Sequence, residues 1–217
     1  MSNTHAQIIV DGKQIQAEPG KSVLGACLEN GIYIPNLCFL ESQLQPPASC
    51  RLCFVEIDGI DDPVPACTLP VENGLNIRTD TAAVRRLQRS ALKLLLSVHD
   101  VACKRCHANR KCELQKIARF LSVGLKSTPL DHHLKPEEID RSHPEIDYYP
   151  NRCVLCGKCV SVCQSNHAYP FLTLSGRGFQ TTISSYPFGD DVTGPSCRNC
   201  AQCIDICPVG ALQFRES

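Results

Sequence analysis

The spacing of its cysteines constrains this chain more than any other feature of the sequence. Four cysteines in the arrangement Cys-x2-Cys-x2-Cys-x3-Cys occur twice in the last third of the chain. The first run holds Cys153, Cys156, Cys159 and Cys163, and the second holds Cys197, Cys200, Cys203 and Cys207. Disulfides inside such short intervals would close small, strained loops, whereas closely spaced thiolates are easily directed at one metal centre. The spacing therefore predicts metal binding.

Composition and charge agree with this interpretation. The chain has 217 residues, of which 16 are cysteine, and no basic segment followed by an apolar stretch stands at its start, so we expect no secretory signal. In a reducing cytoplasm, clustered cysteines are more often metal ligands than disulfides. The 22 basic and 22 acidic residues balance, which gives no long-range attraction to nucleic acid. No apolar run is long enough to span a bilayer. We expect a cytoplasmic protein with no nucleic-acid partner and no membrane span.

The two C-terminal runs resemble those of bacterial two-cluster ferredoxins, in which the fourth cysteine of each run binds the other cluster. The resemblance implies one [4Fe–4S] cluster on Cys153, Cys156, Cys159 and Cys207, and a second on Cys163, Cys197, Cys200 and Cys203. Two features depart from the ferredoxin pattern: Gln164 follows Cys163 where proline is usual, and residues 164–196 are a long insertion. The alternative is a pair of four-cysteine zinc sites.

A second kind of cysteine set lies nearer the N-terminus, in a segment whose pattern predicts strands. It consists of Cys38, Cys50, Cys53 and Cys67. Residues 7–10 and 14–17 flank Asp11-Gly12, a hairpin turn signal, and residues 52–58 alternate between apolar and polar. We expect a short helix over Val23–Glu29 between these strands. The set resembles plant-type [2Fe–2S] ferredoxins, which have a β-grasp fold. The eleven residues between Cys38 and Cys50 resemble more closely the [2Fe–2S] domain of the large iron–sulfur subunit of complex I and its hydrogenase relatives. A zinc site is the alternative.

The middle set has only three thiols, those of Cys103, Cys106 and Cys112. A fully held [4Fe–4S] cluster needs a fourth ligand, and His99 precedes the set at the end of an expected amphipathic helix over residues 81–98, with Val84, Leu87, Ala91, Leu94 and Val98 on its apolar face. A histidine at a helix C-terminus is ordinarily a favourable cap. The spacing of His99 and these cysteines resembles the motif of one histidine and three cysteines in complex I and in [FeFe] hydrogenases. The resemblance implies that His99 is the fourth ligand; His107, inside the loop that must wrap the cluster, competes poorly.

These assignments use every cysteine except Cys27, which lies among small apolar residues of the expected short helix and is predicted to be a buried thiol. The other histidines are interpreted as ordinary surface or structural residues: His5, His132, His133, His143 and His167. Three arginines lie inside Cys-x2-Cys turns, and either favour the reduced cluster or are simply solvated: Arg51, Arg105 and Arg198. Residues 131–149 have the polarity of a linker, and residues 173–183 the pattern of a hairpin.

The predicted fold class is α+β, in three domains. A β-grasp [2Fe–2S] domain is expected over residues 1–78. A small helical domain with the histidine-ligated [4Fe–4S] cluster, and a linker, is expected over residues 79–145. A two-cluster [4Fe–4S] ferredoxin domain is expected over residues 146–217.

The order of these groups resembles the N-terminal region of [FeFe] hydrogenases, the small diaphorase subunit of NAD-reducing [NiFe] hydrogenases, and parts of NAD-dependent formate dehydrogenases. The sequence has no dinucleotide-binding fingerprint and no P-loop, and the ten residues after Cys207 leave no room for a catalytic domain. We therefore expect a non-catalytic, free-standing electron-transfer subunit.

The resemblance implies that this subunit links the small and large subunits of a hydrogenase to a flavin- and NAD-binding diaphorase subunit, in the reaction H2 + NAD+ = NADH + H+. The equivalent subunit of a formate dehydrogenase or of a multi-subunit [FeFe] hydrogenase is the alternative. A structural zinc protein is a more distant one.

Overall fold

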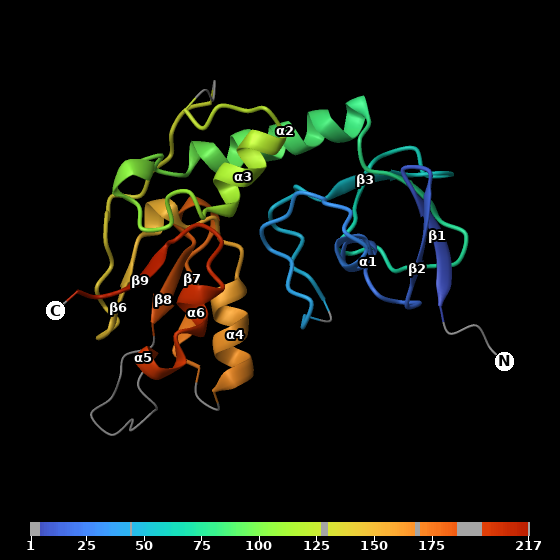
Figure 1. The fold of residues 1–217 in the computed structure, drawn as a ribbon. Helices are drawn as coiled ribbons and strands as arrows, with labels where there is room; N and C mark the ends of the chain where they lie inside the picture. Colours follow the sequence, from blue (N-terminus) through green and yellow to red (C-terminus); the bar gives the residue numbers. More distant parts are fainter. Residues whose placement is uncertain (1–4, 44, 127–129, 168–169, 186–196, 217) are drawn as a thin grey trace. The chain divides into compact units, whose positions relative to one another are not determined.

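The chain forms two compact units, traced along the sequence in Figure 1. The computed structural model describes residues 5–43, 45–126, 130–167, 170–185 and 197–216. The first unit, called here the N-terminal unit, comprises Met1–Lys93 with Phe120–Val123. The second, the C-terminal unit, comprises Leu94–Arg119 with Gly124–Ser217. The expected division into three domains stays a prediction. The two ends of the chain, and residues 168–169 and 186–196 of the long insertion, lie outside the described residues.

Five strands build the sheet of the N-terminal unit in the order β2-β1-β5-β3-β4. Their bounds are β1 Ala6–Val10, β2 Lys13–Ala17, β3 Phe54–Ile57, β4 Val64–Pro65 and β5 Asn76–Arg78. β1 and β2 form a hairpin in which Val10 pairs with Lys13. The two turn residues, Asp11 and Gly12, have φ of 50° and 80°, as a two-residue turn of this kind requires. The hairpin and the strand expected within 52–58 are therefore confirmed.

Helix α1 (Val23–Glu29) begins where the Ser22 hydroxyl accepts a hydrogen bond from the backbone N–H of Gly25 at 3.1 Å. Its first five residues are buried in the same core as Ile8 of β1 and Ile77 of β5. Cys27 is fully buried in this core, and burial, with the charge of Asp11, raises the pKa of its thiol to about 12. The predicted helix and the predicted packing role of Cys27 are confirmed.

Helix α2 (Ala82–Ser97) confirms the long helix expected over 81–98, but its buried face differs from the predicted one. Leu94, placed on the apolar face by sequence pattern, is 61% exposed. The buried face instead includes Gln88, whose side-chain amide donates to the carbonyl of Phe54 at 3.3 Å. Because a polar residue with a backbone partner occupies the buried stripe, hydrophobic periodicity alone misplaced that stripe.

The C-terminal unit combines short helices with two separate two-stranded antiparallel sheets. Its helices are α3 Glu113–Phe120, α4 Lys158–Asn166, α5 Cys197–Cys200 and α6 Gln202–Asp205, with 3-10 turns at Cys103–Arg105, Pro150–Arg152 and Gly178–Gln180. Its strands are β6 Ile146–Tyr148, β7 Leu172–Ser175, β8 Thr182–Ser185 and β9 Leu212–Phe214. β7 and β8 confirm the hairpin expected over 173–183. The α+β fold class is confirmed.

The linker interpretation of residues 131–149 is wrong for their last part. Ile146, Asp147 and Tyr148 are all buried in β6, which pairs antiparallel with β9. The buried carboxylate of Asp147 accepts a hydrogen bond from the Arg215 guanidinium at 3.0 Å, which compensates its burial. The partner strand lies more than sixty positions along the chain, so local polarity gave no sign of the pairing.

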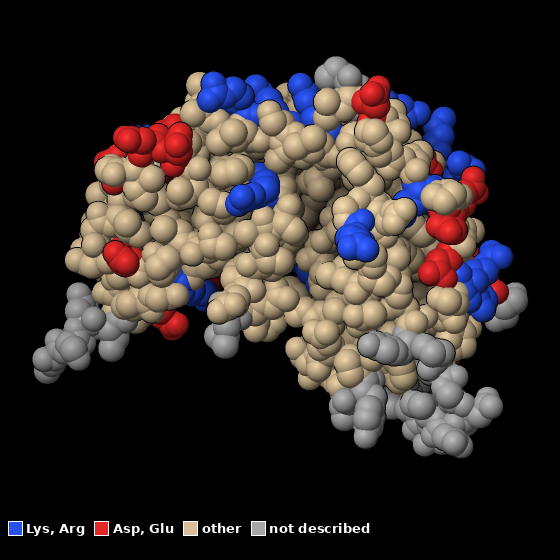
Figure 2. All heavy atoms as spheres, turned by 180° about the vertical axis from the view of Figure 1, so that it is seen from behind, with Lys and Arg blue, Asp and Glu red and all other residues tan. Residues whose placement is uncertain are grey.

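Figure 2 shows acidic and basic side chains on the same face of the molecule, as the balanced composition leads one to expect. In the described part of the chain, no helix is long and apolar enough to cross a membrane.

Candidate metal centres

The four N-terminal cysteines are buried together and form two pairs of thiols. The sulfurs of Cys38 and Cys50 lie 3.4 Å apart, and the thiols of Cys53 and Cys67 share a hydrogen bond. The hydrogen bond with Cys50 lowers the pKa of Cys38 to about 5, and the hydrogen bond with Cys53 likewise lowers the pKa of Cys67. One thiol of each pair therefore ionises readily, and the thiolate is the form that binds metals.

Strand pairing explains how cysteines distant in sequence meet in this set. Cys53 directly precedes β3 and Cys67 closely follows β4, and these strands are antiparallel, with Phe54 opposite Pro65. The N–H of Ala66 donates to the carbonyl of Cys53 at 2.9 Å, which extends the pairing to the cysteines. Arg51 has a left-handed backbone, with φ of 53°, and turns the chain between Cys50 and Cys53. Its charge also lowers the pKa of Cys67, although less than the hydrogen bond does.

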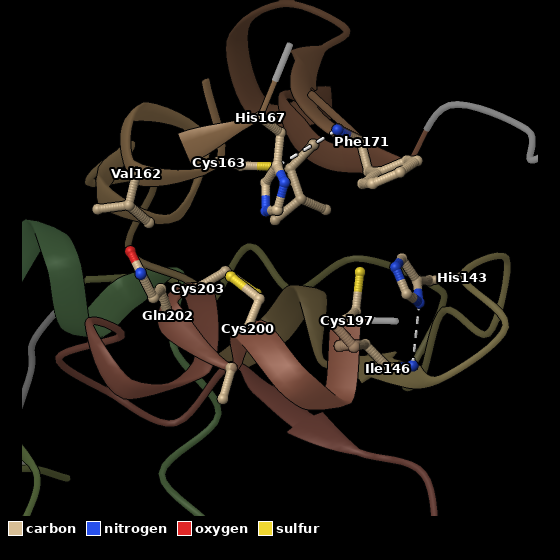
Figure 3. Close-up of a pocket in the computed structure, with 12 residues that line it drawn as sticks. His143, Ile146, Val162, Cys163, His167, Phe171, Cys197, Cys200, Gln202 and Cys203 are labelled. Atoms are coloured by element: carbon tan, nitrogen blue, oxygen red, sulfur yellow. Dashed lines mark hydrogen bonds between the residues drawn. The ribbon is translucent and has the colours of Figure 1, made fainter. Parts of the chain in front are cut away.

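Two apolar cavities lie in the C-terminal unit, and cysteines line both. The first, called here the Cys163 cavity, has a volume of about 20 Å³, and the cysteines in its wall are Cys163, Cys197, Cys200 and Cys203. Figure 3 shows their sulfurs facing a common space. The second, the Cys153 cavity, has a volume of about 10 Å³ and contains Cys153, Cys156, Cys159 and Cys207 in its wall. Each cavity thus takes three cysteines from one run and the fourth from the other.

Helix α4 carries a cysteine of each cavity, because Cys159 lies near its start and Cys163 one turn later. The two cavities are therefore neighbours along this helix. Burial raises the pKa of Cys159, and the charge of Cys203, from the Cys163 cavity, raises it further. Burial likewise raises the pKa of Cys156 and of Cys203, each to about 12. Neutral thiols thus predominate near pH 7 at these positions until a metal displaces their protons.

Backbone N–H groups point at several of these sulfurs. The N–H of Leu155 donates to Cys153 Sγ at 3.4 Å, and that of Ala211 donates to Cys207 Sγ at 3.3 Å. In the Cys163 cavity, the N–H of Phe171 donates to Cys163 Sγ at 3.3 Å. Such bonds favour a negatively charged sulfur and a more reduced metal cluster.

The three middle cysteines lie in the C-terminal unit on a loop that borders the Cys153 cavity. Burial raises the pKa of Cys112, and the charges of Cys106 and Cys103 add to the effect, so the three thiols are electrostatic neighbours. The sulfur of Cys106 lies 4.0 Å from the carbonyl oxygen of Val209, a residue of the Cys153 cavity wall. The N–H of Glu113 donates to the carbonyl of Pro208 at 2.9 Å, which holds the end of this loop in place.

His99 is 8% exposed, and its burial lowers the pKa of its imidazole to about 4. The ring bonds to the backbone of Arg152, while its Nδ1 atom has no hydrogen-bond partner among the described residues. Arg152 in turn donates from its guanidinium to the carbonyl of Arg105 at 3.5 Å, within the middle loop. The structure thus links His99 to the middle loop through Arg152. A neutral imidazole with an unpaired buried nitrogen has the chemistry of a metal ligand.

His107 is placed differently from His99. Its side chain bonds to Gln213 of β9, and a methyl group added at Gly210 would lie 3.0 Å from its Nε2 atom. Its imidazole is therefore held against the segment that follows Cys207. That His107 competes poorly as a ligand stays a prediction.

Two histidines interpreted from the sequence as ordinary residues line the Cys163 cavity, namely His143 and His167. His143 is buried, and its Nδ1 atom accepts hydrogen bonds from the N–H groups of Glu145 and Ile146, both at 3.1 Å. Figure 3 shows its ring beside Cys197. No sequence signal identified it, because tertiary folding alone brings residue 143 to the second cysteine run.

Arg198, inside a Cys-x2-Cys turn, is engaged by other protein groups. Its guanidinium donates to the carbonyl of Arg215 at 2.9 Å and lies over the Phe214 ring, 5.3 Å from the ring centroid. It also lies 3.9 Å from the carboxylate of Glu145. Arg198 is therefore not a freely solvated side chain.

The donor chemistry of all four sets fits iron–sulfur clusters, which are held chiefly by cysteine thiolates. In the described part of the chain, no three His, Cys, Asp or Glu side chains converge tightly enough to hold a single metal ion. Eight thiols instead line two cavities, four form two buried pairs, and the three middle thiols are neighbours on one loop. Which atoms bind which cluster stays a prediction.

Comparison with protein families divides the chain into three matched regions. Residues 3–82 match a 2Fe-2S iron-sulfur cluster binding domain. Residues 88–124 match the NADH-ubiquinone oxidoreductase-G iron-sulfur binding region. Residues 143–213 match the ferredoxin-like domain of NADH-quinone oxidoreductase subunit 3. The expected kinds of cluster-binding region, in the expected order, are thereby confirmed.

Individual proteins resemble the chain over nearly its whole length. It is 32% identical to NADPH-Fe(3+) oxidoreductase subunit alpha of Geobacter sulfurreducens, over 94% of this chain and 24% of the relative. It is 33% identical to NADP-reducing hydrogenase subunit HndD of Solidesulfovibrio fructosivorans, over 96% of this chain and 36% of the relative. The chain thus spans about a quarter to a third of the length of these relatives. A chain in the crystal structure of an NAD+-reducing [NiFe]-hydrogenase in the H2-reduced state superposes with a TM-score of 0.82 and 30% identity, over 98% of this chain and 88% of that one.

Proposed function

This chain belongs to the family of iron–sulfur proteins that includes the matched chain of NAD+-reducing [NiFe]-hydrogenase and the corresponding regions of NADH-quinone oxidoreductases, and we propose that it is their electron-transfer type of subunit. We propose four bound clusters, one [2Fe–2S] and three [4Fe–4S]. When bound, such clusters accept and release single electrons. The chain's own residues hold them, keep them apart from water and set their potentials.

The contiguity of the sites in the C-terminal unit carries this proposal. Val209 belongs to the wall of the Cys153 cavity and lies against the sulfur of Cys106 from the middle set. Helix α4 then joins the Cys153 cavity to the Cys163 cavity through Cys159 and Cys163. Three cysteine-rich sites therefore follow one another within a single compact unit. A series of neighbouring redox centres is what passage of electrons through a protein requires.

The proposed ligands follow from the sets described. Cys38 and Cys50 form one pair and Cys53 and Cys67 the other, and each pair suits one tetrahedral iron of a [2Fe–2S] cluster. His99, with its buried unpaired nitrogen, completes a [4Fe–4S] site with the three middle cysteines. The Cys153 and Cys163 cavities each supply four thiols for one further [4Fe–4S] cluster. Sites with four protein ligands leave no coordination position for a substrate, which favours electron transfer over catalysis.

For the terminal partners, we propose a flavin- and NAD-binding diaphorase subunit on one side and the small and large subunits of a hydrogenase on the other, in the cytoplasm. The 88% coverage of a chain from an NAD+-reducing [NiFe]-hydrogenase supports this choice. The identity with a subunit of an NADP-reducing hydrogenase supports a second candidate, the same role in a multi-subunit hydrogenase of another class. Both candidates assign electron transfer to this chain and differ only in the catalytic module.

Purification of the chain together with its native partners tests the proposal. We expect about 14 iron atoms per chain and no stoichiometric zinc, by metal analysis. Electron paramagnetic resonance (EPR) of the reduced complex should show one [2Fe–2S] and three [4Fe–4S] signals, and NADH should reduce them. Stoichiometric zinc in place of iron would contradict the proposal, and co-purification of a nickel–iron subunit would select the first candidate over the second.

A further inference from the structure

Tyr148 places a phenol in the wall of the Cys153 cavity. It is the last residue of β6, and its side chain is buried, with 6% of the residue exposed. Its backbone N–H and carbonyl both bond to Asp140, at 3.0 and 2.8 Å, and it pairs with Leu212 of β9. The backbone on both sides of β6 therefore fixes the position of this ring.

The hydroxyl of Tyr148 already accepts two hydrogen bonds from β8. The Thr182 hydroxyl and the backbone N–H of Ile183 both donate to it, each at 3.3 Å. A phenol oxygen has a single hydrogen, which is left to donate to a third group. The Cys153 thiol lines the same cavity as this phenol and interacts with it electrostatically, which makes its sulfur the acceptor that we assign.

The electrostatics of Cys153 agree with such a donor. Burial raises the pKa of the Cys153 thiol, and the hydrogen bond from Tyr148 opposes this rise by favouring the thiolate. A phenol ordinarily titrates only at about pH 10, so Tyr148 keeps its proton near neutral pH. Tyr148 is therefore a permanent donor and not a group that titrates in the working range.

We infer that Tyr148 donates a hydrogen bond to the sulfur of Cys153 and thereby raises the reduction potential of the cluster in the Cys153 cavity. The inference rests on the proposed function, because it takes Cys153 to be a cluster ligand. Reduction adds one electron to the cluster while the phenol proton stays on its oxygen, so no proton transfer accompanies the step. A donor to a ligand sulfur stabilises the more negative, reduced state.

The effect is confined to one of the two cavities. The described residues that line the Cys163 cavity include no tyrosine but two histidines, His143 and His167, so the two sites differ in the polar side chains beside their cysteines. Tyr148 is accordingly a positioning residue that separates the potentials of two neighbouring [4Fe–4S] clusters.

The adjacent Tyr149 provides a matched control. Its hydroxyl accepts a hydrogen bond from the Gln213 side chain at 2.7 Å, and the Arg152 guanidinium lies 3.9 Å from its ring centroid. It is not among the residues that line the Cys153 cavity. Tyr149→Phe therefore removes a phenol oxygen from the same part of the chain without touching a cysteine sulfur.

The test is a redox titration, followed by EPR, of the full cluster-loaded chain and of the variants Tyr148→Phe and Tyr149→Phe. The signal of the Cys153 cavity is assigned beforehand from its perturbation in Cys156→Ser. For Tyr148→Phe we expect the equilibrium constant for reducing this cluster to fall about three- to tenfold, a shift of about 30 to 60 mV to more negative potential. Tyr149→Phe should leave it unchanged. An unshifted signal in a Tyr148→Phe protein with full iron content would overturn the inference.

If the Tyr148→Phe protein loses the cluster, a second variant tests the hydrogen bond from Tyr148 to Cys153. Replacing Tyr148 by 3-fluorotyrosine keeps the ring and its packing but makes the hydroxyl a stronger donor. We expect this replacement to shift the same signal to more positive potential, and no shift, or a negative one, overturns the inference. Failure of the proposed function looks different, because the unmodified chain would then contain no [4Fe–4S] signals at all.

Discussion

Gly157 and Ala201 occupy equivalent positions in the two cysteine runs, and both have a left-handed backbone, with φ of 74° and 55°. Each directly follows the second cysteine of its run and is the N-cap of the helix that carries the third, α4 in one case and α6 in the other. The same turn thus wraps both runs around their cavities. Glycine adopts this conformation freely, whereas alanine is strained in it.

The relationship predicts a stabilising substitution, Ala201→Gly. Relief of about 1 to 2 kcal/mol of backbone strain is partly offset by the greater freedom of glycine in the unfolded chain, about 0.4 to 1 kcal/mol. We expect a net gain of roughly 0.5 kcal/mol, seen as a higher midpoint of thermal unfolding by circular dichroism.

The reverse substitution, Gly157→Ala, should lower the midpoint. A methyl group at Gly157 would meet no atom within 4 Å, so backbone strain is the only cost. Ala83→Gly, in the first turn of α2, is the control, because glycine in an ordinary helical position destabilises. A midpoint lowered by Ala201→Gly as much as by Ala83→Gly would contradict the argument.

Cys27 should be dispensable for every cluster. Cys27→Ser should leave the iron content and all cluster signals unchanged, because this thiol is buried in the hydrophobic core as part of α1. It should nevertheless lower the free energy of unfolding by about 1 to 3 kcal/mol, since a buried hydroxyl replaces an apolar thiol. Cys27→Ala, which introduces no polar atom, serves as the control. Loss of any cluster signal in either variant would show that the ligand assignment is wrong.

His99→Ala should weaken or abolish only the middle [4Fe–4S] signal. The substitution removes the buried nitrogen that has no hydrogen-bond partner in the described part of the chain. His107→Ala is the matched control, because that imidazole is held by Gln213 and should be replaceable without loss of a cluster. EPR spectra and iron content measure both. An unchanged spectrum in His99→Ala would place the fourth ligand elsewhere.

His143 should stabilise the fold through its Nδ1 atom. His143→Leu leaves the N–H groups of Glu145 and Ile146 without this acceptor, and we expect a loss of about 1 to 3 kcal/mol in the free energy of unfolding. His143→Asn keeps a side-chain oxygen near the same position and should recover part of that loss. Equal stabilities of the two variants, measured as unfolding midpoints, would argue against the role of this acceptor.

Cluster loading should make this electrically balanced chain acidic. Its 22 basic and 22 acidic side chains cancel, but the proposed thiolate ligands and oxidised clusters together add a charge of about −7. Native isoelectric focusing should therefore place the loaded protein well below the pI of about 7.0 that the bare sequence implies. A pI that does not change on loading would mean that fewer thiolates are bound than proposed.

Local chemistry explains which parts of the fold were predictable. Asp11-Gly12 favours a two-residue hairpin turn whatever surrounds it. The Ser22 hydroxyl likewise caps α1 by accepting a hydrogen bond from the N–H of Gly25, only three residues later. The buried face of α2 was not predictable in this way. Gln88 is buried because the Phe54 carbonyl, on a strand far away in sequence, accepts its hydrogen bond.

Cysteines with two or three residues between them can be recognised in the sequence, and this spacing predicts sets of metal-binding thiols. The side chains other than cysteine that enter the cavities follow from the packing of distant segments. Tyr148 reaches Cys153 because β6 pairs with β9 and approaches β8, and His143 reaches the second run because its imidazole binds the N–H groups at the start of β6. The physical reason is that hydrogen bonds between distant segments are set by the packing of the whole unit, and no local pattern encodes them.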